Sequence, residues 1–231
     1  PAAQLGRAMA RARPPRPQPA LTSIEECRAL IAACEYARAR VSVLLASRFL
    51  ALTAVRLEAV RGMRWSEIEP DEDREGLQGR WIWRVPPARM KLARAKKQDA
   101  RFAHLVPLSA EAVAVLRAAA NSYPGDANLH SLPANLHALV FPGRDGVTPI
   151  GEGAIGALYA RAGFAGRHVP HGWRSSFSTI LNETMPPEWR ADIDRALAHS
   201  PKDKVEAAYN RAAQLGRRRQ LFDRWGALLA G

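Results

Sequence analysis

Two short segments late in the chain carry side chains that can act on a phosphate group. In His171-Gly-Trp-Arg174 an imidazole and a guanidinium stand three residues apart, which places both on one face of a helix. A neutral histidine can accept a proton, and an arginine can hold two phosphate oxygens in a fork. Further along, His199 precedes Tyr209 by ten residues, and a tyrosine hydroxyl can serve as a nucleophile. These four residues are candidates for phosphoryl-transfer chemistry.

Two cationic residues earlier in the chain could complete such a site. Arg56 follows a strongly apolar segment and begins the next predicted helix, so its side chain can point at an anion. Lys91 comes just after a tryptophan-rich predicted strand and can reach a phosphate or a leaving group. Taken singly, each is more often an ordinary solvated side chain. The chemistry therefore depends on whether the fold brings these residues together.

The order of these segments resembles that of the tyrosine recombinases, and specifically of the prophage-type integrases. His171-Gly-Trp-Arg174 is similar to the His-x-x-Arg box of that family. Leu197-Ala-His199, followed by Tyr209, is similar to its Leu-x-His box and nucleophile. Arg56 and Lys91 stand where the family has its first arginine and its hairpin lysine. The agreement of six polar residues in one order is far more specific than any one of them.

The resemblance extends from about Leu21 to Leu229 and implies a site-specific DNA recombinase, or integrase, of a mobile element. Such an enzyme cuts and rejoins DNA through a 3′-phosphotyrosine intermediate, without metal, ATP or another cofactor. The implied partners are double-stranded DNA attachment sites, further copies of the chain in a tetramer on DNA, and a DNA-bending accessory protein.

The resemblance also assigns a role to each residue. Tyr209 attacks the phosphate, His171 accepts the phenol proton, and Lys91 protonates the departing 5′-oxygen. Two arginines and His199 stabilise the charge on the non-bridging oxygens. The expected catalytic residues are Arg56, Lys91, His171, Arg174, His199 and Tyr209.

One position departs from the family pattern. Integrases of this type commonly carry Glu three residues after the first arginine, which here is Arg56, ahead of Trp65-Ser-Glu-Ile68. The corresponding residue is Ala59, and an acid stands one position earlier, at Glu58. A shift of one residue rotates a side chain by about 100° around a helix. We therefore expect Glu58 not to replace the family glutamate.

The charge of the chain favours a polyanionic partner. Lys and Arg number 34 against 22 acidic residues, which gives a formal net charge of +12. Neutralisation of phosphates by such residues dominates non-specific affinity for nucleic acid. We expect most of these contacts to set affinity rather than sequence choice. The expected DNA-binding residues are Arg94, Lys96, Lys97, Arg101, Lys202 and Lys204.

Cysteine usage and hydropathy exclude several other classes of protein. Cys27 and Cys34 fall on one predicted helix about 10 Å apart, too far for a disulfide. We expect two reduced core cysteines in a cytoplasmic protein. No cluster of Cys and His has the spacing of metal ligands. No apolar stretch approaches the roughly 20 residues of a membrane span.

The pattern of apolar residues predicts an α+β fold that is mainly α, with a small antiparallel sheet inserted early. Ser23 and Glu26 form a predicted capping box at the first helix. Short strands are predicted over residues 80–86 and 102–107, with a basic hairpin loop at 91–101 between them. Further helices are predicted at 41–53, 56–64, 109–120, 151–162, 171–183, 187–198, 202–211 and 214–229.

The domain organisation follows from the two ends of the chain. Residues 1–20 are basic and proline-rich, which is typical of a linker and leads us to expect an earlier domain. Residues 21–231 form the predicted catalytic domain, ending in a tail helix. The apolar residues of that helix need a partner surface, either on their own domain or on a neighbouring recombinase.

Three alternatives remain at this point. A type IB topoisomerase-like enzyme would nick and reseal one strand without recombination. An inactive recombinase remnant would only bind DNA, which the Ala59 departure would explain. An unrelated basic helical regulator would explain the charge but not the ordered Arg, Lys, His-x-x-Arg, His and Tyr.

Overall fold

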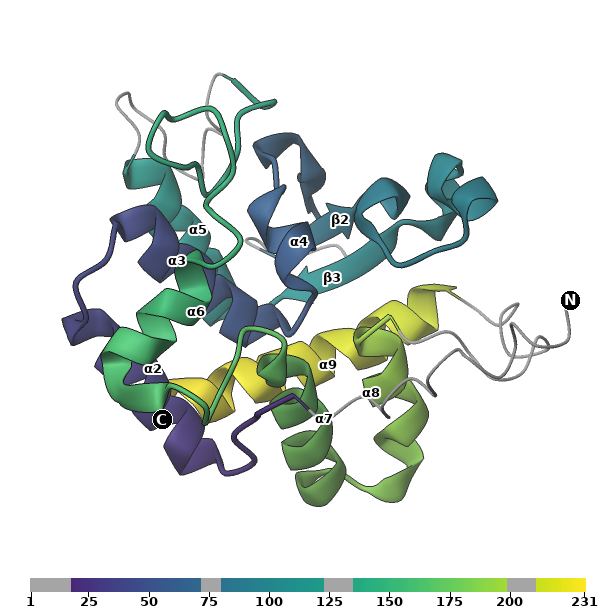
Figure 1. Ribbon diagram of the computed structural model, residues 1–231. Helices are drawn as coiled ribbons and strands as arrows, with labels where there is room; N and C mark the ends of the chain where they lie inside the picture. Colours follow the sequence, from purple (N-terminus) through teal and green to yellow (C-terminus); the bar gives the residue numbers. More distant parts are fainter. Residues whose placement is uncertain (1–17, 72–79, 123–134, 199–210) are drawn as a thin grey trace, which may run out of the picture.

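Helices surround a small antiparallel sheet in the computed structural model, which describes residues 18–71, 80–122, 135–198 and 211–231 (Figure 1). The longest helix, α9 (Arg211–Ala230), runs through the middle and contacts elements from every part of the chain. The mainly helical α+β fold class is thus confirmed. The remaining helices are α2 (Ile24–Tyr36), α3 (Val41–Thr53), α4 (Leu57–Arg61), α5 (Ala110–Asn121), α6 (Ala154–Tyr159), α7 (Gly172–Thr184) and α8 (Arg190–Ala196).

Helices α2 and α3 form where the sequence predicts them. The Ser23 hydroxyl accepts the backbone N–H of Glu26 at 3.4 Å and caps α2. The carboxylate of Glu26 pairs with Arg167 instead of closing the predicted capping box. Helix α3 is apolar on nearly all sides because it packs against α5, α6 and α9 together.

The sheet has three strands in the order β1-β2-β3, all antiparallel. The predicted strands are observed as β2 (Trp81–Val85) and β3 (His104–Leu108), with Val85 opposite His104. The third strand, β1 (Ile68–Pro70), has only three residues and was missed. Its Ile68 pairs with Trp83. A strand this short is too brief for an alternating pattern to be recognised.

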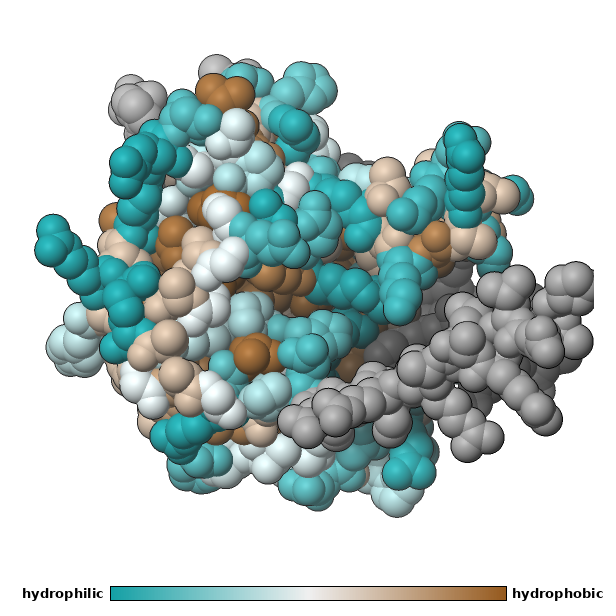
Figure 2. Space-filling model, in the orientation of Figure 1, coloured by the Kyte–Doolittle hydropathy of each residue, from teal (hydrophilic) through white to brown (hydrophobic). Residues whose placement is uncertain are grey.

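The segment between β2 and β3 forms a projecting arm rather than a plain loop. It holds the short 3-10 turns η2 (Pro87–Arg89), η3 (Arg94–Gln98) and η4 (Ala100–Phe102). In Figure 1 the arm extends away from the helical body, and in Figure 2 much of its surface is hydrophilic. Its exposed position suits contact with a large partner.

Several predicted boundaries are wrong. The predicted helix at 56–64 is only α4, because Gly62 follows its last turn. The predicted helix at 187–198 is a 3-10 turn, η6 (Pro187–Trp189), followed by α8. The predicted helix at 151–162 is α6 with a π-type turn, η5 (Ala160–Phe164), and Gly163 at φ +88° marks its end. Most of the helix predicted at 202–211, and residues 1–17 of the predicted linker, lie outside the described residues.

Both cysteines are reduced and buried in the core, as predicted. Burial raises the pKa of each thiol to about 11, so Cys27 and Cys34 stay protonated near neutral pH. Within the described ranges, no helix is long and apolar enough to cross a membrane.

Helix α9 packs on its own domain. Leu221, Phe222 and Trp225 are fully buried. The Trp225 indole N–H donates to the carbonyl of Ala51 in α3 at 2.8 Å. The apolar face that needed a partner therefore finds it within the same chain.

Two glycines of α9 provide a matched test of this packing. A methyl group at Gly226 would lie 2.5 Å from Oγ and 2.9 Å from Cβ of Ser109, the cap of α5. We expect Gly226→Ala to lower the free energy of unfolding by about 1–3 kcal/mol, measured by urea titration. At Gly216 no described atom lies within 4 Å of the added methyl. There alanine should raise the free energy by up to about 1 kcal/mol through helix propensity. Equal changes in the free energy of unfolding at the two positions would contradict the close packing of α9 against Ser109.

Candidate active site

A narrow crevice gathers residues from the ends of α3, α4, β2, β3, α7 and α8. Its volume is about 10 Å³, room for no more than one water molecule, so a ligand must bind at its mouth. Two arginines and one histidine are its only ionisable side chains among the described residues. The lining residues are Val55, Arg56, Ala59, Val85, Met90, His104, Arg174, Leu197 and Ala198.

Arg174 is buried at the base of this crevice, with 6% of its surface exposed. It lies in the first turn of α7, and its guanidinium reaches two backbone carbonyls from distant parts of the chain. One amino group donates to Ala54 O at 3.1 Å, just after α3, and the other to Leu197 O at 2.5 Å, just after α8. Carbonyls at helix ends carry partial negative charge, so the cation is favourable there.

Arg56 enters the same crevice from the start of α4, where it is the N-cap residue and half-buried. Burial lowers the pKa of its guanidinium. Burial and the nearby charge of Arg56 lower the pKa of Arg174 to about 10. No carboxylate stands among the described residues that line the crevice. Two like charges held together without a counter-charge are costly, which is typical of an anion site.

The two turns that hold Arg174 adopt an unusual backbone conformation. Ala54 has φ +47° and Ala198 has φ +53°, and they are the only non-glycine residues with positive φ in the described chain. For alanine this region costs about 1 kcal/mol or more. Strained turns therefore occur at both points where a carbonyl faces the buried guanidinium.

His104 completes the crevice and was missed by the sequence analysis. It is the first residue of β3, 9% exposed, and its Nε2 lies 3.1 Å from Ala196 O. Burial, and next the charge of Arg218, lower the pKa of His104 to about 3. A single histidine at the start of a strand has no distinguishing sequence signal, because its burial depends on the packing of α8 against it.

Lys91 directly follows Met90, which lines the crevice, but its own side chain is exposed. The chain therefore places Lys91 one residue from the crevice lining, at the root of the arm. The root is anchored by an ion pair between Arg89 and Glu67. Glu67 also accepts the indole N–H of Trp83 at 3.0 Å.

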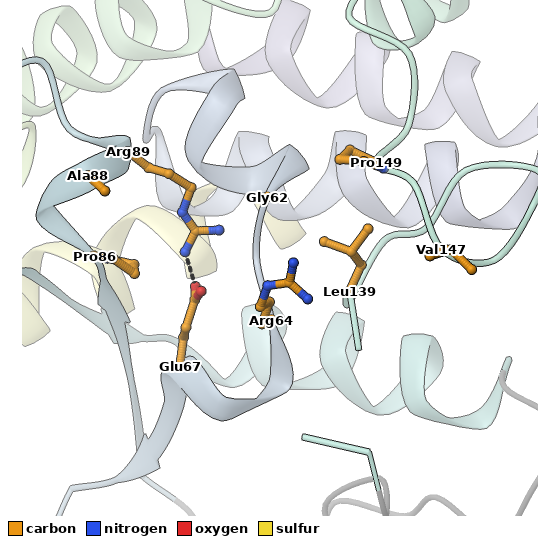
Figure 3. Close-up of a pocket in the computed structure, with 9 residues that line it drawn as sticks. All are labelled: Gly62, Arg64, Glu67, Pro86, Ala88, Arg89, Leu139, Val147 and Pro149. Atoms are coloured by element: carbon orange, nitrogen blue, oxygen red, sulfur yellow. Dashed lines mark ion pairs between the residues drawn. The ribbon is translucent and has the colours of Figure 1, made fainter. Parts of the chain in front are cut away.

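A larger hollow of about 460 Å³ lies beside α4, on the side of this ion pair. Figure 3 shows Arg89 and Glu67 pointing toward each other, with Arg64 nearby and Leu139 and Val147 on the opposite wall. None of the four predicted catalytic residues that the structure describes, Arg56, Lys91, His171 and Arg174, lines this hollow. Two of them, Arg56 and Arg174, line the smaller crevice instead.

The remaining predicted catalytic residues are not all brought into the crevice. His171 is exposed, directly before α7, and its carbonyl accepts the backbone N–H of Arg174 at 3.2 Å. It shares the first turn with Arg174 but does not line the crevice. His199 and Tyr209 lie outside the described residues; the described stretch that precedes them ends at Ala198, which does line the crevice.

The basic residues predicted on the arm are all exposed. Lys96 lies 5.1 Å from the ring centroid of Phe102. The guanidinium of Arg101 donates to both carboxylate oxygens of Asp99, and this pair raises the pKa of Arg101. Lys202 and Lys204 lie outside the described residues. Across the part of the chain that is described, no group of three or more His, Cys, Asp or Glu could hold a metal ion.

The departure at Ala59 has a structural counterpart. Ala59 is buried and faces the crevice. Glu58 is exposed and pairs with Arg61 at 2.8 Å. The acid therefore lies on the outer side of α4, as the helical rotation predicted, and does not compensate the arginine pair.

The segment around Pro19–Leu21, here called the strap, is hydrogen-bonded to the helix that carries Arg174 and to the residues just before it. The Nδ1 of His168, just before α7, accepts the N–H of Leu21 at 3.1 Å. The Ser176 hydroxyl donates to the carbonyl of Leu21 at 2.5 Å. The N–H of Val169 donates to Pro19 O at 3.3 Å. The segment that precedes α2 is thus fixed against the start of α7.

Comparisons with known proteins indicate the family of the chain. The family model described as the phage integrase family matches residues 21–215. Prophage integrase IntZ of Escherichia coli strain K12 is 34% identical over 197 residues, which are 83% of this chain and 41% of the relative. The integrase of Shigella phage Sf6 is 30% identical over 184 residues, 79% of this chain and 40% of that protein. The chain therefore spans about two fifths of the length of these relatives.

A solved structure supports the fold. The crystal structure of XerA recombinase matches with a TM-score of 0.52 and 16% identity, over 90% of this chain and 66% of that one. At this identity the likeness concerns the fold alone.

The hydrogen bond between His168 and Leu21 makes the stability of the fold depend on pH. Burial lowers the pKa of His168 to about 4, and its Nδ1 must stay unprotonated to accept from Leu21. Because the unfolded chain takes up this proton at about pH 6.5, stability falls as the pH drops from there toward the folded pKa.

We expect the wild-type free energy of unfolding to fall between pH 6.5 and 4.5, by up to about 1.4 kcal/mol per pH unit for each buried histidine. His168→Asn keeps an acceptor that does not titrate. It should be less stable at pH 7 but lose less with acid, as measured by urea titration at several pH values. A slope unchanged from wild type would contradict the prediction.

Proposed function

Because the chain belongs to the phage integrase family, we propose that it is a tyrosine-type site-specific recombinase that cuts and rejoins DNA strands through Tyr209. The proposal covers the reaction class and the residues that perform it. The attachment site, the tetramer and the accessory protein are also proposals, since the chain spans only part of its relatives.

One observation carries the proposal most directly. Arg56 and Arg174 face one crevice, are separated by 118 positions in the chain, and have no carboxylate among the described residues around them. A phosphodiester supplies the negative charge that this pair lacks. The charge grows on the non-bridging oxygens in the transition state, where forked, permanently charged donors act most strongly.

In the proposed reaction the Tyr209 oxygen attacks a DNA phosphorus. The bond from phosphorus to the 5′-oxygen breaks and a 3′-phosphotyrosine forms. His171 accepts the phenol proton, and Lys91 donates a proton to the departing 5′-oxygen. His199 adds a hydrogen bond to the phosphate. A second 5′-hydroxyl then reverses these steps on another strand, so the bond energy is conserved and no nucleotide is consumed.

The exposure of His171 and Lys91 is compatible with these roles. Both flank the crevice by chain connection: His171 shares a turn with Arg174, and Lys91 follows Met90. A proton donor or acceptor for DNA bound at the mouth must lie outside the crevice rather than within it. The buried arginines hold the phosphate, and the exposed groups exchange protons with it.

The test of the nucleophile uses covalent capture. We would incubate the chain with a library of nicked duplexes of random sequence, which trap a cleaved intermediate, and recover DNA that stays attached in detergent. Wild type should yield covalent complexes and Tyr209→Phe none, with DNA affinity unchanged because only a hydroxyl is lost. Arg174→Ala should slow cleavage by about 10²–10³-fold. Tyr36→Phe, at a tyrosine that is 91% exposed, is the matched control and should cleave normally.

Each other outcome identifies a different function. Retention of cleavage by Tyr209→Phe would refute the nucleophile. DNA binding by wild type without any covalent complex would indicate the inactive remnant, which the buried Ala59 would explain. Relaxation of supercoiled plasmid without strand exchange would indicate a topoisomerase-like enzyme.

We further propose that the arm binds DNA phosphates through Arg94, Lys96 and Lys97 more than through Arg101. Asp99 already occupies the guanidinium of Arg101. Replacing the first three by Gln should reduce the slope of log affinity against log salt by about 0.9 for each lost contact. Arg101→Gln is the control and should change the slope less. A change as large as that of the others would contradict this assignment.

A further inference from the structure

The turn at the end of α8 is held by two side chains from different elements. Ala196 O lies 3.1 Å from Nε2 of His104, at the start of β3. The next carbonyl, Leu197 O, accepts from Arg174 in α7 at 2.5 Å. Two successive carbonyls are thus each engaged by a buried side chain. Neither partner can shift without moving the turn that the other contacts.

The surroundings of His104 keep its ring neutral. It is buried, and the cations that face it are Arg56, Arg174 and Arg218, with burial as the larger cause of its pKa of about 3. A neutral imidazole carries one N–H. Since a carbonyl oxygen can only accept, that proton lies on Nε2 and is donated to Ala196 O. The ring therefore adds a hydrogen bond beside the arginines without adding a third charge.

We infer that His104 is a positioning residue: by holding Ala196 O, it fixes the Ala196–Leu197 turn that seats the guanidinium of Arg174. This rests on the proposed function, in which Arg174 binds the reacting phosphate. The turn needs such support because Ala198 follows it with φ +53°, a conformation that alanine does not favour by itself.

The position of His104 also connects the turn to the arm. His104 pairs with Val85 across the sheet, and both line the crevice. The arm that carries Lys91 leaves from β2 and returns into β3 at His104. One hydrogen bond thus joins the base of the arm to the turn that holds Arg174.

Two substitutions at His104 separate the hydrogen bond from packing. His104→Leu fills the space but leaves Ala196 O without its donor. His104→Gln places an amide N–H at a reach similar to Nε2. Val106, two residues further along β3, is fully buried and does not line the crevice. The Val106→Ala variant is therefore the control for a loss of stability alone.

Two quantities are measured on a duplex recovered by covalent capture: the single-turnover cleavage rate and the affinity of the protein for that duplex. The third measurement is hydrogen–deuterium exchange at the backbone amides of residues 190–198. His104→Leu should slow cleavage by about 10–100-fold, because a displaced catalytic group loses its alignment, and leave affinity within about two-fold. It should also speed amide exchange at the end of α8. His104→Gln should recover most of the rate and protection, and Val106→Ala should cleave at the wild-type rate below its unfolding transition.

The inference would be overturned if the His104→Leu variant cleaved DNA at the wild-type rate. It would also be overturned if the His104→Gln variant cleaved as slowly as the His104→Leu variant. If wild type itself never attaches to DNA, the proposed function fails, and amide exchange alone decides the role of His104. Exchange at residues 190–198 that is the same in wild type and His104→Leu would then refute the positioning role.

Discussion

The structure of the site depends on one interaction: the Arg174 guanidinium is buried and donates hydrogen bonds to two backbone carbonyls. A buried cation requires hydrogen-bond acceptors, and here they are the carbonyls of Ala54 and Leu197 rather than a carboxylate. These carbonyls satisfy the N–H groups without neutralising the charge. The C-terminal ends of α3 and α8 therefore both lie against the first turn of α7, where each presents a carbonyl to the guanidinium.

This arrangement is costly for the folded state, and its costs are concentrated at one place. Arg56 adds a second positive charge, Ala59 contributes no acid, and two alanines adopt positive φ values. The remainder of the domain, with its indole-to-carbonyl bond between Trp225 and Ala51, must offset these costs. Backbone strain, and positive charge with no carboxylate among the described residues that line the crevice, are typical of a site that binds an anion.

The elements that carry the site are held in place by residues that are not predicted to be catalytic. His168 and Ser176 fix the segment around Leu21 against α7, and Glu67 anchors the root of the arm through Arg89. These contacts are long-range, and no local pattern marks the residues that make them. Arg56 and Arg174 line the narrow crevice, whereas Arg89 and Glu67 line the larger hollow near Arg64.

The sequence by itself determined what depends on near neighbours. Caps and apolar periodicity act over about four residues, so the Ser23 cap, α3 and the two longer strands could be predicted, and the ordered polar residues indicated the family. The tertiary structure alone decided which cations are buried together, that His104 lies beneath them, and that α9 folds onto its own domain. Those outcomes depend on packing between segments far apart in the chain: Arg56 and Arg174 are separated by 118 positions, and His104 and Ala196 by 92. Burial rather than residue type sets the charge and the contacts of these side chains.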